Sequence, residues 1–234
     1  MIDVIENKLF ATSIFQLKLP NYGLFNRDFI DYIYKLKDKD PIGNPRSNYG
    51  GWHSKNLNFN DKVVSDFCTN VDPILINLGE VLNWDMKNYI LAFQETWSII
   101  NKKGDFNQAH RHGNSILSLV YYVKFPKQEN IEDGSIYFQD PRVAGISRKP
   151  IMETPKTRED AAKNKFYSGQ THSSGQHIHL PQEGDILIFP GWLEHGVYPN
   201  TSNEDRIIIS ANINFFPKEL ENSKKLIHKS DIYT

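Results

Sequence analysis

Two histidines separated by one residue are the strongest chemical signal in this sequence. His110 and His112 lie in the stretch GDFNQAHRHGNSILSLVYY, residues 104–122, at the end of a predicted strand. Because successive side chains of a strand point to opposite faces, residues two apart share a face, and both imidazoles are directed to one side. Two converging neutral imidazoles suit a divalent transition metal, which needs a further ligand from elsewhere in the chain. The pair therefore predicts part of a metal site.

The other candidate site residues come from later in the chain. His195, in GDILIFPGWLEHGVYPN, is the best candidate for the third ligand, and Arg206 follows eleven residues later in the strand-like run RIIISANINFF. We interpret these residues as one site because a close histidine pair, a distant third histidine and a buried cation occur together. Any one of them alone would carry little information. His177 and His179 form a second His-x-His pair. We expect these two to be solvated or to face a substrate, with competition for the metal as the alternative.

Strand-like segments that begin after residue 88 must position these side chains. Short runs rich in β-branched and aromatic residues occupy residues 89–93, 96–101, 116–125, 134–138, 176–180, 185–189 and 206–216. Mostly short turns join them, and this organisation favours a sandwich or barrel with metal ligands inside its mouth. The stretch 142–176 is polar and lacks a steady period, so it is predicted to be an insertion or a long loop.

The N-terminal third is predicted to cover this sheet. Residues 8–19 alternate apolar and polar side chains like an opening strand, whereas residues 24–36 and 61–82 carry apolar residues at helical spacing. Pro73 is expected to break or kink the second helix, and residues 37–60 are loop-like. We therefore expect a single domain, 1–234, with a strand and helical cover in 1–87, a β core in 88–216 and a charged tail in 217–234.

Composition narrows the class of protein. With 234 residues and 39% hydrophobic content, the chain can bury a full core. A net charge of −1 argues against nucleic acid as a partner, since such proteins carry a clear basic excess. The single cysteine, Cys68, excludes an internal disulfide, and no early apolar run is long enough for a signal peptide or membrane span. We therefore expect a cytoplasmic protein without a membrane partner, monomeric or homodimeric.

Residues 104–216 resemble the double-stranded β-helix, a jelly-roll or cupin-like barrel, of the Fe(II)/2-oxoglutarate-dependent dioxygenases, close to the prolyl-hydroxylase-like branch. The resemblance is carried by GDFNQAHRH, LSLVYYV, GDILIFPGWLEHGV and DRIIIS, in this order. LFATSIF and GGWHSKNL, nearer the N-terminus, also resemble a bacterial and phage subfamily of 2-oxoglutarate oxygenases. The fold class that the resemblance implies is mainly β with N-terminal helices.

The resemblance implies an enzyme that uses Fe(II), 2-oxoglutarate and O2 to hydroxylate a peptide or small molecule, with 2-oxoglutarate decarboxylated to succinate. His110 and His195 correspond to the two family histidines, and His112 to the usual acidic ligand. Arg206 lies where the family has the cation that grips the far carboxylate of 2-oxoglutarate, a task for which a guanidinium offers two parallel charged hydrogen bonds. Tyr122 aligns with a family tyrosine that hydrogen-bonds the co-substrate.

The period of two nominates further residues on these strands. Ser210 shares a strand face with Arg206, as do Ile208 and Asn212, so Ser210 is a candidate to support the same carboxylate. Tyr121 is expected to point to the opposite face from Tyr122.

His112 departs from the family, which usually has His-x-Asp where this chain has His-x-His. A neutral imidazole raises the formal charge of the site by one, although three-histidine iron sites occur among related β-barrel dioxygenases. His112 is therefore either a metal ligand or a hydrogen-bonding group behind the ligands. For the whole protein, the alternative to an oxygenase is a non-catalytic, metal-stabilised β-barrel that binds a ligand. Arg206 favours the oxygenase, because a purely structural metal site needs no carboxylate clamp.

Overall fold

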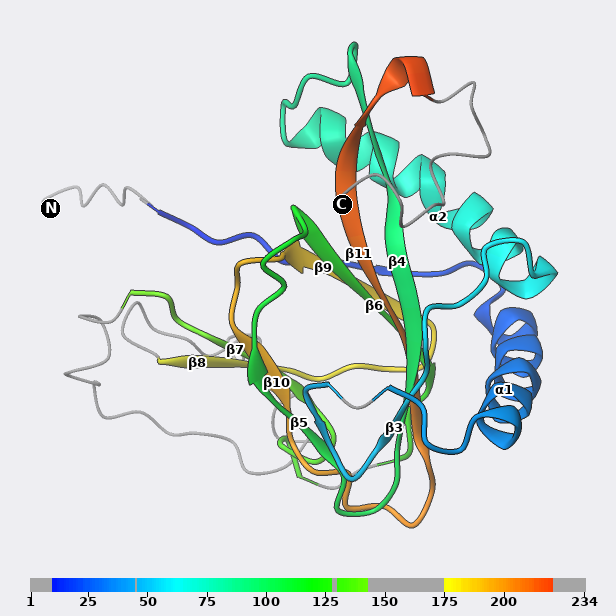
Figure 1. Ribbon diagram of the computed structural model, residues 1–234. Helices are drawn as coiled ribbons and strands as arrows, with labels where there is room; N and C mark the ends of the chain where they lie inside the picture. Colours follow the sequence, from blue (N-terminus) through cyan, green and yellow to red (C-terminus); the bar gives the residue numbers. More distant parts are fainter. Residues whose placement is uncertain (1–9, 45, 128–129, 143–174, 221–234) are drawn as a thin grey trace, which may run out of the picture.

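Two antiparallel β-sheets form the body of the protein (Figure 1). The structure is a computed structural model that describes residues 10–44, 46–127, 130–142 and 175–220. In sheet order, the larger sheet contains β1 (Phe15–Lys18), β9 (Asp185–Pro190), β6 (Leu117–Lys124), β11 (Arg206–Pro217), β4 (Tyr89–Asn101) and β3 (Trp52–His53). The smaller sheet contains β2 (Asn48–Tyr49), β5 (Phe106–His110), β10 (His195–Val197), β7 (Ile136–Gln139) and β8 (Gln176–His179). The arrangement is the predicted double-stranded β-helix.

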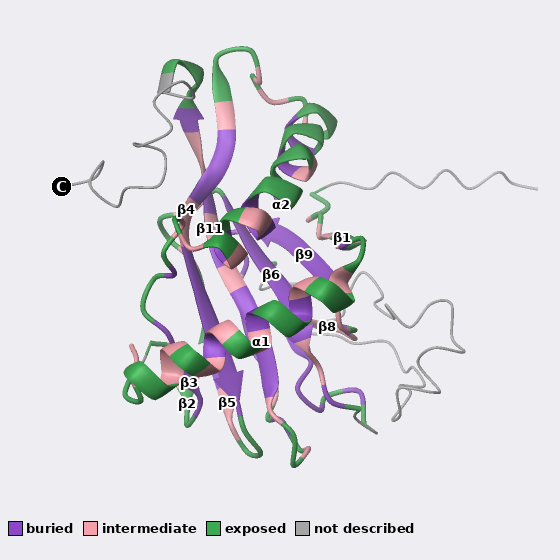
Figure 2. Cartoon of the chain, turned by 90° about the vertical axis from the view of Figure 1, so that its right-hand side faces the viewer, coloured by how far each residue is buried: buried purple, intermediate pink, exposed green. Residues whose placement is uncertain are grey.

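Two α-helices cover the outer face of the larger sheet. In Figure 2, α1 (Tyr22–Lys39) and α2 (Lys62–Val81) lie in front of the strands, with exposed residues directed outward and buried strands behind them. Each helix carries its buried residues on one stripe at three- and four-residue spacing, which is the pattern that folds as an amphipathic helix against a sheet. A short 3-10 helix, η2 (Lys218–Leu220), follows β11. The predicted N-terminal helical cover is therefore present.

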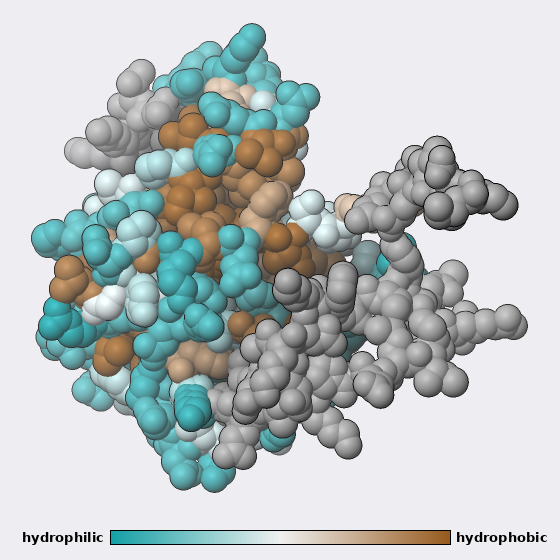
Figure 3. Space-filling model, turned by 180° about the vertical axis from the view of Figure 1, so that it is seen from behind, coloured by the Kyte–Doolittle hydropathy of each residue, from teal (hydrophilic) through white to brown (hydrophobic). Residues whose placement is uncertain are grey.

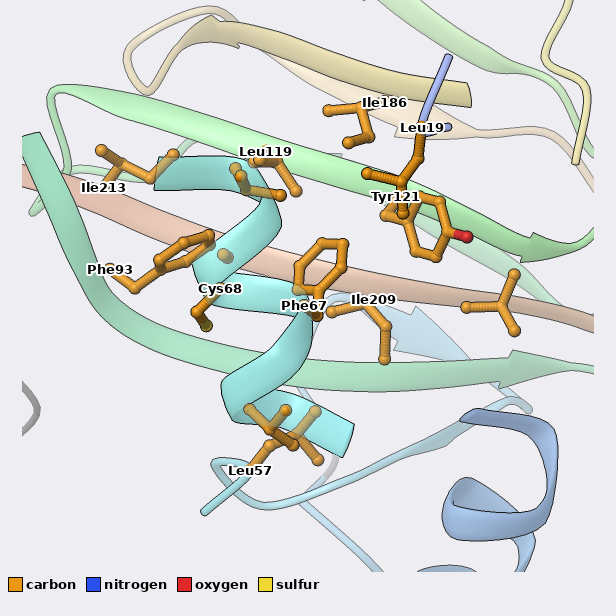
Figure 4. Close-up of a cluster of buried hydrophobic side chains, with 14 of the residues drawn as sticks. Leu19, Leu57, Phe67, Cys68, Phe93, Leu119, Tyr121, Ile186, Ile209 and Ile213 are labelled. Carbon is orange, nitrogen blue, oxygen red and sulfur yellow. The ribbon is translucent and has the colours of Figure 1, made fainter. Parts of the chain in front are cut away.

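A large apolar cluster fills the space between the helices and the larger sheet. Phe67 and Cys68 of α2 lie over strands that carry Phe93 and Tyr121 (Figure 4). The Phe67 ring centroid is 5.1 Å from that of Tyr121 and 6.2 Å from that of Phe93. Full burial of one such large apolar side chain contributes about 1.5–3 kcal/mol to stability. This cluster therefore stabilises the fold from the side of the sheet that does not face the second sheet.

Alternate residues of β6 and β11 belong to different cores. Tyr121 and Ile209 pack in the cluster under the helices, whereas Tyr122 and Ile208 belong to a second cluster. The second cluster also contains residues of β7 and β10, so it lies between the two sheets. The predicted opposite orientation of the two tyrosines is therefore confirmed.

One strand of the larger sheet combines two strands that the sequence predicted separately. Residues 89–93 and 96–101, predicted as two short strands, form the single strand β4. Its pairing with β11 shifts between Asn212, which lies opposite Glu95, and Ile213, which lies opposite Phe93. Gln94 is the extra residue of this β-bulge. The two predicted strands are thus the two halves of one bulged strand.

Other segments also differ from the prediction. Pro73 does not break α2, because it lies on the exposed side, where a carbonyl that loses its helical partner can bond to water. The region predicted as a loop contains β2 and β3, and β10 was not predicted, since strands of two or three residues are too short to show a period. Most of the predicted insertion, residues 143–174, and most of the predicted tail, residues 221–234, lie outside the described residues.

The surface combines polar and apolar areas. Seen from behind, apolar side chains gather in the upper middle of the view, with polar side chains above and below them (Figure 3). Helix α2 and the outer ends of β4 and β11 lie at this height in Figure 1. Among the described residues, no helix is both long enough and apolar enough to cross a membrane.

Candidate active site

A cavity of about 630 Å³ collects the predicted site residues. Its wall includes His110, His112, His195 and Arg206. β5 and β10, which carry two of the histidines, are neighbours in the smaller sheet, whereas Arg206 begins β11 in the larger sheet (Figure 1). The two sheets therefore contribute different walls, and the enclosed space is of the size that small-molecule sites use.

The three histidines converge although they come from separate segments. His195 of β10 lies opposite His110 of β5 in the antiparallel register of the smaller sheet. The ligand atoms of His110, His112 and His195 all lie within 4.8 Å of one another. In the part of the chain that the structure describes, no other group of three His, Cys, Asp or Glu side chains is placed to hold a metal. His177 and His179 of β8 lie outside this cluster.

His112 reaches the cluster from a loop, not from the strand. β5 ends at His110, so alternation along a strand does not account for the convergence of the two rings. The His112 backbone N–H donates to the Gly191 carbonyl over 2.9 Å, which ties this loop to the segment before His195. A Cβ added at Gly191 would lie 2.3 Å from the Ser115 carbonyl oxygen and 2.9 Å from that of His112. Glycine thus permits the close backbone approach that positions His112.

Hydrogen bonds fix which nitrogen of each imidazole carries the proton. The Nδ1–H groups of His110 and His195 each donate over 2.8 Å to the backbone carbonyl of the residue two positions earlier. The Nδ1–H of His112 donates over 2.6 Å to Oδ1 of Asn212. Because a carbonyl oxygen can only accept, each Nδ1 carries the proton and each Nε2 keeps its lone pair. All three rings therefore present the nitrogen that binds metals.

One pair of Nε2 atoms has the spacing of two ligands of one ion, because those of His110 and His112 are 3.2 Å apart. With both protons on Nδ1, the two lone pairs face each other and repel unless a cation lies between them. Two nitrogens about 2.1 Å from one metal and at right angles to each other are separated by about 3 Å. The three histidines therefore fit a divalent transition metal such as Fe(II).

Burial favours the neutral imidazoles that metal binding requires. Desolvation lowers the pKa of His195, with a smaller contribution from the nearby His110 and His112, to about 3. Burial also lowers the pKa values of His110 and His112. A neutral ring competes for a metal without first losing a proton, so the cluster is ready to bind at neutral pH.

Arg206 is a buried cation in the same cavity. Its side chain is 1% exposed, its Nε donates over 3.0 Å to the Gly134 carbonyl, and its Nη1 donates over 3.2 Å to Oδ1 of Asn101. The Tyr122 ring centroid is 5.4 Å from the guanidinium carbon. Burial lowers the pKa of Arg206, and the interaction with Tyr122 raises it. Among the described residues no carboxylate pairs with Arg206, so the guanidinium, which lines the cavity, is available to pair with an anion bound there.

The strand face predicted from the period of two lines the cavity. Arg206, Ile208, Ser210 and Asn212 of β11 all contribute to its wall. The polar members of this face thus lie along one line, from the buried cation to the histidine that Asn212 contacts. This spacing allows Ser210 to support a ligand held by Arg206.

Sequence reasoning missed the side chains that hold the site residues in place. Asn101 at the end of β4 holds Arg206, and Glu95 in the middle of β4 bonds Asn212. His53 of β3 also lines the cavity; it stacks on Trp97 with ring centroids 5.7 Å apart, and burial lowers its pKa to about 4. Asn101 directly follows the apolar pair Ile99 and Ile100, and this contrast could have marked it, whereas Glu95 lies in the polar triplet 94–96 and does not stand out in the sequence.

The fold and the cavity define a class of metal-dependent β-barrel enzymes, and comparison with known proteins identifies the family. Residues 95–212 match the family model described as "Putative 2OG-Fe(II) oxygenase". This chain belongs to that family of 2-oxoglutarate- and Fe(II)-dependent oxygenases. A search of curated proteins gives no match.

Solved structures with the same fold include several enzymes of this class. A Pseudomonas putida prolyl-4-hydroxylase aligns with a TM-score of 0.59 at 12% identity, covering 87% of this chain and 93% of that one. HygX from Streptomyces hygroscopicus, with nickel and 2-oxoglutarate bound, aligns with a TM-score of 0.57 at 16% identity, covering 87% and 83%. The viral collagen prolyl hydroxylase of Paramecium Bursaria Chlorella virus-1, in complex with 2-oxoglutarate, has a TM-score of 0.52 at 12% identity, covering 86% and 94%. At these identities the likeness concerns the fold.

These findings confirm the predicted family, the predicted fold class and the prediction of an enzyme. They also confirm Fe(II) as the cofactor and 2-oxoglutarate as the co-substrate of this family.

Proposed function

We propose that the protein is a hydroxylase that couples oxidation of a peptide or small molecule to the conversion of 2-oxoglutarate and O2 into succinate and CO2. One oxygen atom of O2 enters the substrate C–H bond as a hydroxyl group, and the other enters succinate. The family assignment supports the use of Fe(II) and 2-oxoglutarate. The prolyl-4-hydroxylase likeness supports a hydroxylation, without indicating which substrate is hydroxylated.

In this proposal His110, His112 and His195 hold the iron through their Nε2 atoms. The Nδ1–H bonds of all three rings keep these nitrogens directed at one point. Three protein ligands on a six-coordinate metal leave positions for a co-substrate and O2. Fe(II), when bound, supplies the electron transfer that activates O2.

The protein's own residues bind and orient the co-substrate. Arg206 receives the carboxylate of 2-oxoglutarate that is far from the metal, and Tyr122 and Ser210 support it from the neighbouring strand and the same strand. Asn101 and the Gly134 carbonyl hold the guanidinium from behind, so little side-chain freedom is lost on binding. Arg206 itself is buried, so its charged hydrogen bonds to a carboxylate would be stronger than in bulk water.

The observation that carries the proposal is a buried arginine without a described carboxylate partner, in one cavity with three converging histidines. Burying a charge is costly unless a counter-charge meets it. A dicarboxylate with one end on the metal and the other on Arg206 provides that counter-charge. A metal site that served stability alone would need no such cation.

The test is an anaerobic titration of the Fe(II)-loaded protein with 2-oxoglutarate. We expect a weak visible charge-transfer band of Fe(II) chelated by the 2-oxo acid, and slow release of succinate once O2 is admitted, even without the true substrate. Omission of iron, or its removal by a chelator, is the control and should abolish both signals.

The second candidate is a non-catalytic, metal-stabilised barrel that binds a ligand. It is favoured by the composition of the histidine cluster, which no carboxylate among the described residues joins. This candidate predicts metal binding with neither the charge-transfer band nor succinate release, so the same titration separates the two.

A further inference from the structure

His112 differs from the other two histidines in the group that accepts its Nδ1–H. His110 and His195 donate to backbone carbonyls, whereas His112 donates to Oδ1 of Asn212 over 2.6 Å. Asn212 donates in turn from Nδ2 to Oε2 of Glu95 over 3.2 Å. A carboxylate oxygen only accepts, so this second bond fixes the amide with Oδ1 toward His112. Two hydrogen bonds in series therefore link the imidazole to a carboxylate.

The backbone register builds this link. Asn212 of β11 and Glu95 of β4 lie directly opposite each other in the antiparallel ladder. The β-bulge at Gln94 is adjacent to this pair, and beyond it the pairing of β11 with β4 is shifted by one residue. The position of the bulge therefore sets the register that places Glu95 opposite Asn212. Both side chains line the cavity. The carboxylate thus lies within reach of the histidine cluster because of strand pairing.

No close ion pair among the described residues compensates the carboxylate of Glu95. Its side chain is 26% exposed, and the cation that approaches it among the described residues is Arg46, whose Nη1 is 4.0 Å from Oε2. The Arg46 side chain is 49% exposed. An ion pair this long and this open to water neutralises little charge.

The charge of Glu95 balances the site. Fe(II) carries two positive charges and 2-oxoglutarate two negative ones, the three imidazoles are neutral, and Arg206 adds one positive charge. Leaving aside Arg46 and Arg111, whose side chains are largely exposed, these groups sum to one positive charge inside the cavity, where electrostatic interactions are stronger than in water. One carboxylate cancels it. Glu95 is bonded to the side chain that holds His112, the ligand at the position where the family usually has an acid.

We propose that Glu95, acting through Asn212, is a positioning residue that aims the Nε2 lone pair of His112 at the metal and supplies the negative charge that a three-histidine site lacks. This inference rests on the proposed function, because it takes His112 as a metal ligand. Acceptors behind ligating histidines fix the ring and raise its basicity, and their loss typically costs about 10- to 100-fold in metal affinity.

The first experiment removes the charge and keeps the shape. Co(II) and Fe(II) affinities of the full, metal-depleted chain are measured by anaerobic titration, with Co(II) absorption as the probe. We expect Glu95→Gln to bind both ions about 10- to 100-fold more weakly than the wild type. The matched control is Glu204→Gln, which makes the same change at a 65% exposed carboxylate paired with Lys124, and should bind like the wild type. Thermal unfolding of each metal-free variant checks that the fold is retained.

The second experiment exchanges the amide and the carboxylate. The double variant Glu95→Gln/Asn212→Asp moves the negative charge onto the side chain that accepts the His112 Nδ1–H, while the new amide can donate to the new carboxylate. It should restore metal affinity to within about threefold of the wild type, since charge and hydrogen bond are both recovered. The Fe(III)/Fe(II) potential should rise in Glu95→Gln, because loss of negative charge destabilises the more positive ion, and should fall again in the double variant.

The outcomes separate this inference from the proposed function. Wild-type affinity and potential in Glu95→Gln overturn the inference alone, as does a double variant that binds no better than Glu95→Gln. A wild-type protein that binds neither ion overturns the proposed function and the inference together.

Discussion

Removal of Arg206 should chiefly weaken the binding of 2-oxoglutarate. The guanidinium is 1% exposed and has no described carboxylate partner, so a bound dianion would form a fully desolvated pair with it. Truncation of one partner of a buried, hydrogen-bonded charge pair costs roughly 2–5 kcal/mol. This corresponds to a rise in Kd of about 30- to 5,000-fold. We expect a loss in this range for Arg206→Ala.

Two matched variants identify the cause of the loss. Arg206→Met keeps most of the side-chain volume without the charge, so it should lose about as much affinity as Arg206→Ala. Arg206→Lys keeps the charge without the planar fork and should lose less, because a lysine cannot form two parallel hydrogen bonds to one carboxylate. If Arg206→Met bound 2-oxoglutarate normally, packing and not charge would explain the alanine result.

The assay is calorimetric titration of 2-oxoglutarate into Mn(II)-loaded protein without O2, with the Mn(II) affinity measured separately by electron paramagnetic resonance. The metal affinity should change much less than the co-substrate affinity, because Arg206 does not belong to the histidine cluster. Unchanged co-substrate affinity in Arg206→Ala would refute the reasoning and place 2-oxoglutarate elsewhere. An equal loss of metal affinity would refute it as well, since it would indicate a collapsed site.

Two further predictions concern single residues. His112→Ala should weaken Fe(II) binding by at least about 10- to 100-fold. His112→Asp should retain binding, because its carboxylate provides an anionic oxygen donor. Equal affinities of the two variants in an anaerobic Fe(II) titration would place His112 outside the ligand set. Tyr121→Phe removes the 2.5 Å hydrogen bond that the Tyr121 hydroxyl donates to Oδ1 of the buried Asn26, and it should lower the free energy of unfolding by about 1–3 kcal/mol. Urea denaturation measures this loss, and 2-oxoglutarate affinity should not change, because Tyr121 faces the helices; a changed affinity would contradict the separation of the two strand faces.

Residue types and the period of two predicted much of the architecture. The alternation on β6 separated Tyr121 from Tyr122, and that on β11 aligned Arg206 with Ser210, because each of these strands has one face toward each core. The short strand-like segments and short turns favoured a sandwich or barrel, and the family resemblance carried by the ordered motifs implied the double-stranded β-helix. The alternation within a strand is a local signal, so it can be found in the sequence without knowing which strands pair.

The remaining parts depend on pairing between distant segments. Glu95 lies opposite Asn212 only because the register shift at Gln94 falls one residue away, and no pattern within either strand encodes that register. His112 joins the cluster through a loop held by Gly191, so its placement depends on a backbone contact with a segment far along the chain. The convergence of His110 and His112 was thus predicted from the alternation of a strand that ends before His112.

The assembly of the histidine cluster from remote segments has a consequence for how the protein folds. The pairing of β10 with β5 closes a long loop, whose entropic cost must be met before His195 can approach His110. In the proposed site, iron would therefore gain its full set of ligands only once the smaller sheet has formed, and we expect this to be late in folding. A ligand that binds the native state and not the transition state slows unfolding without speeding folding. Metal loading should therefore slow the unfolding of this protein. Iron limitation would shorten the lifetime of the folded chain in addition to abolishing its activity.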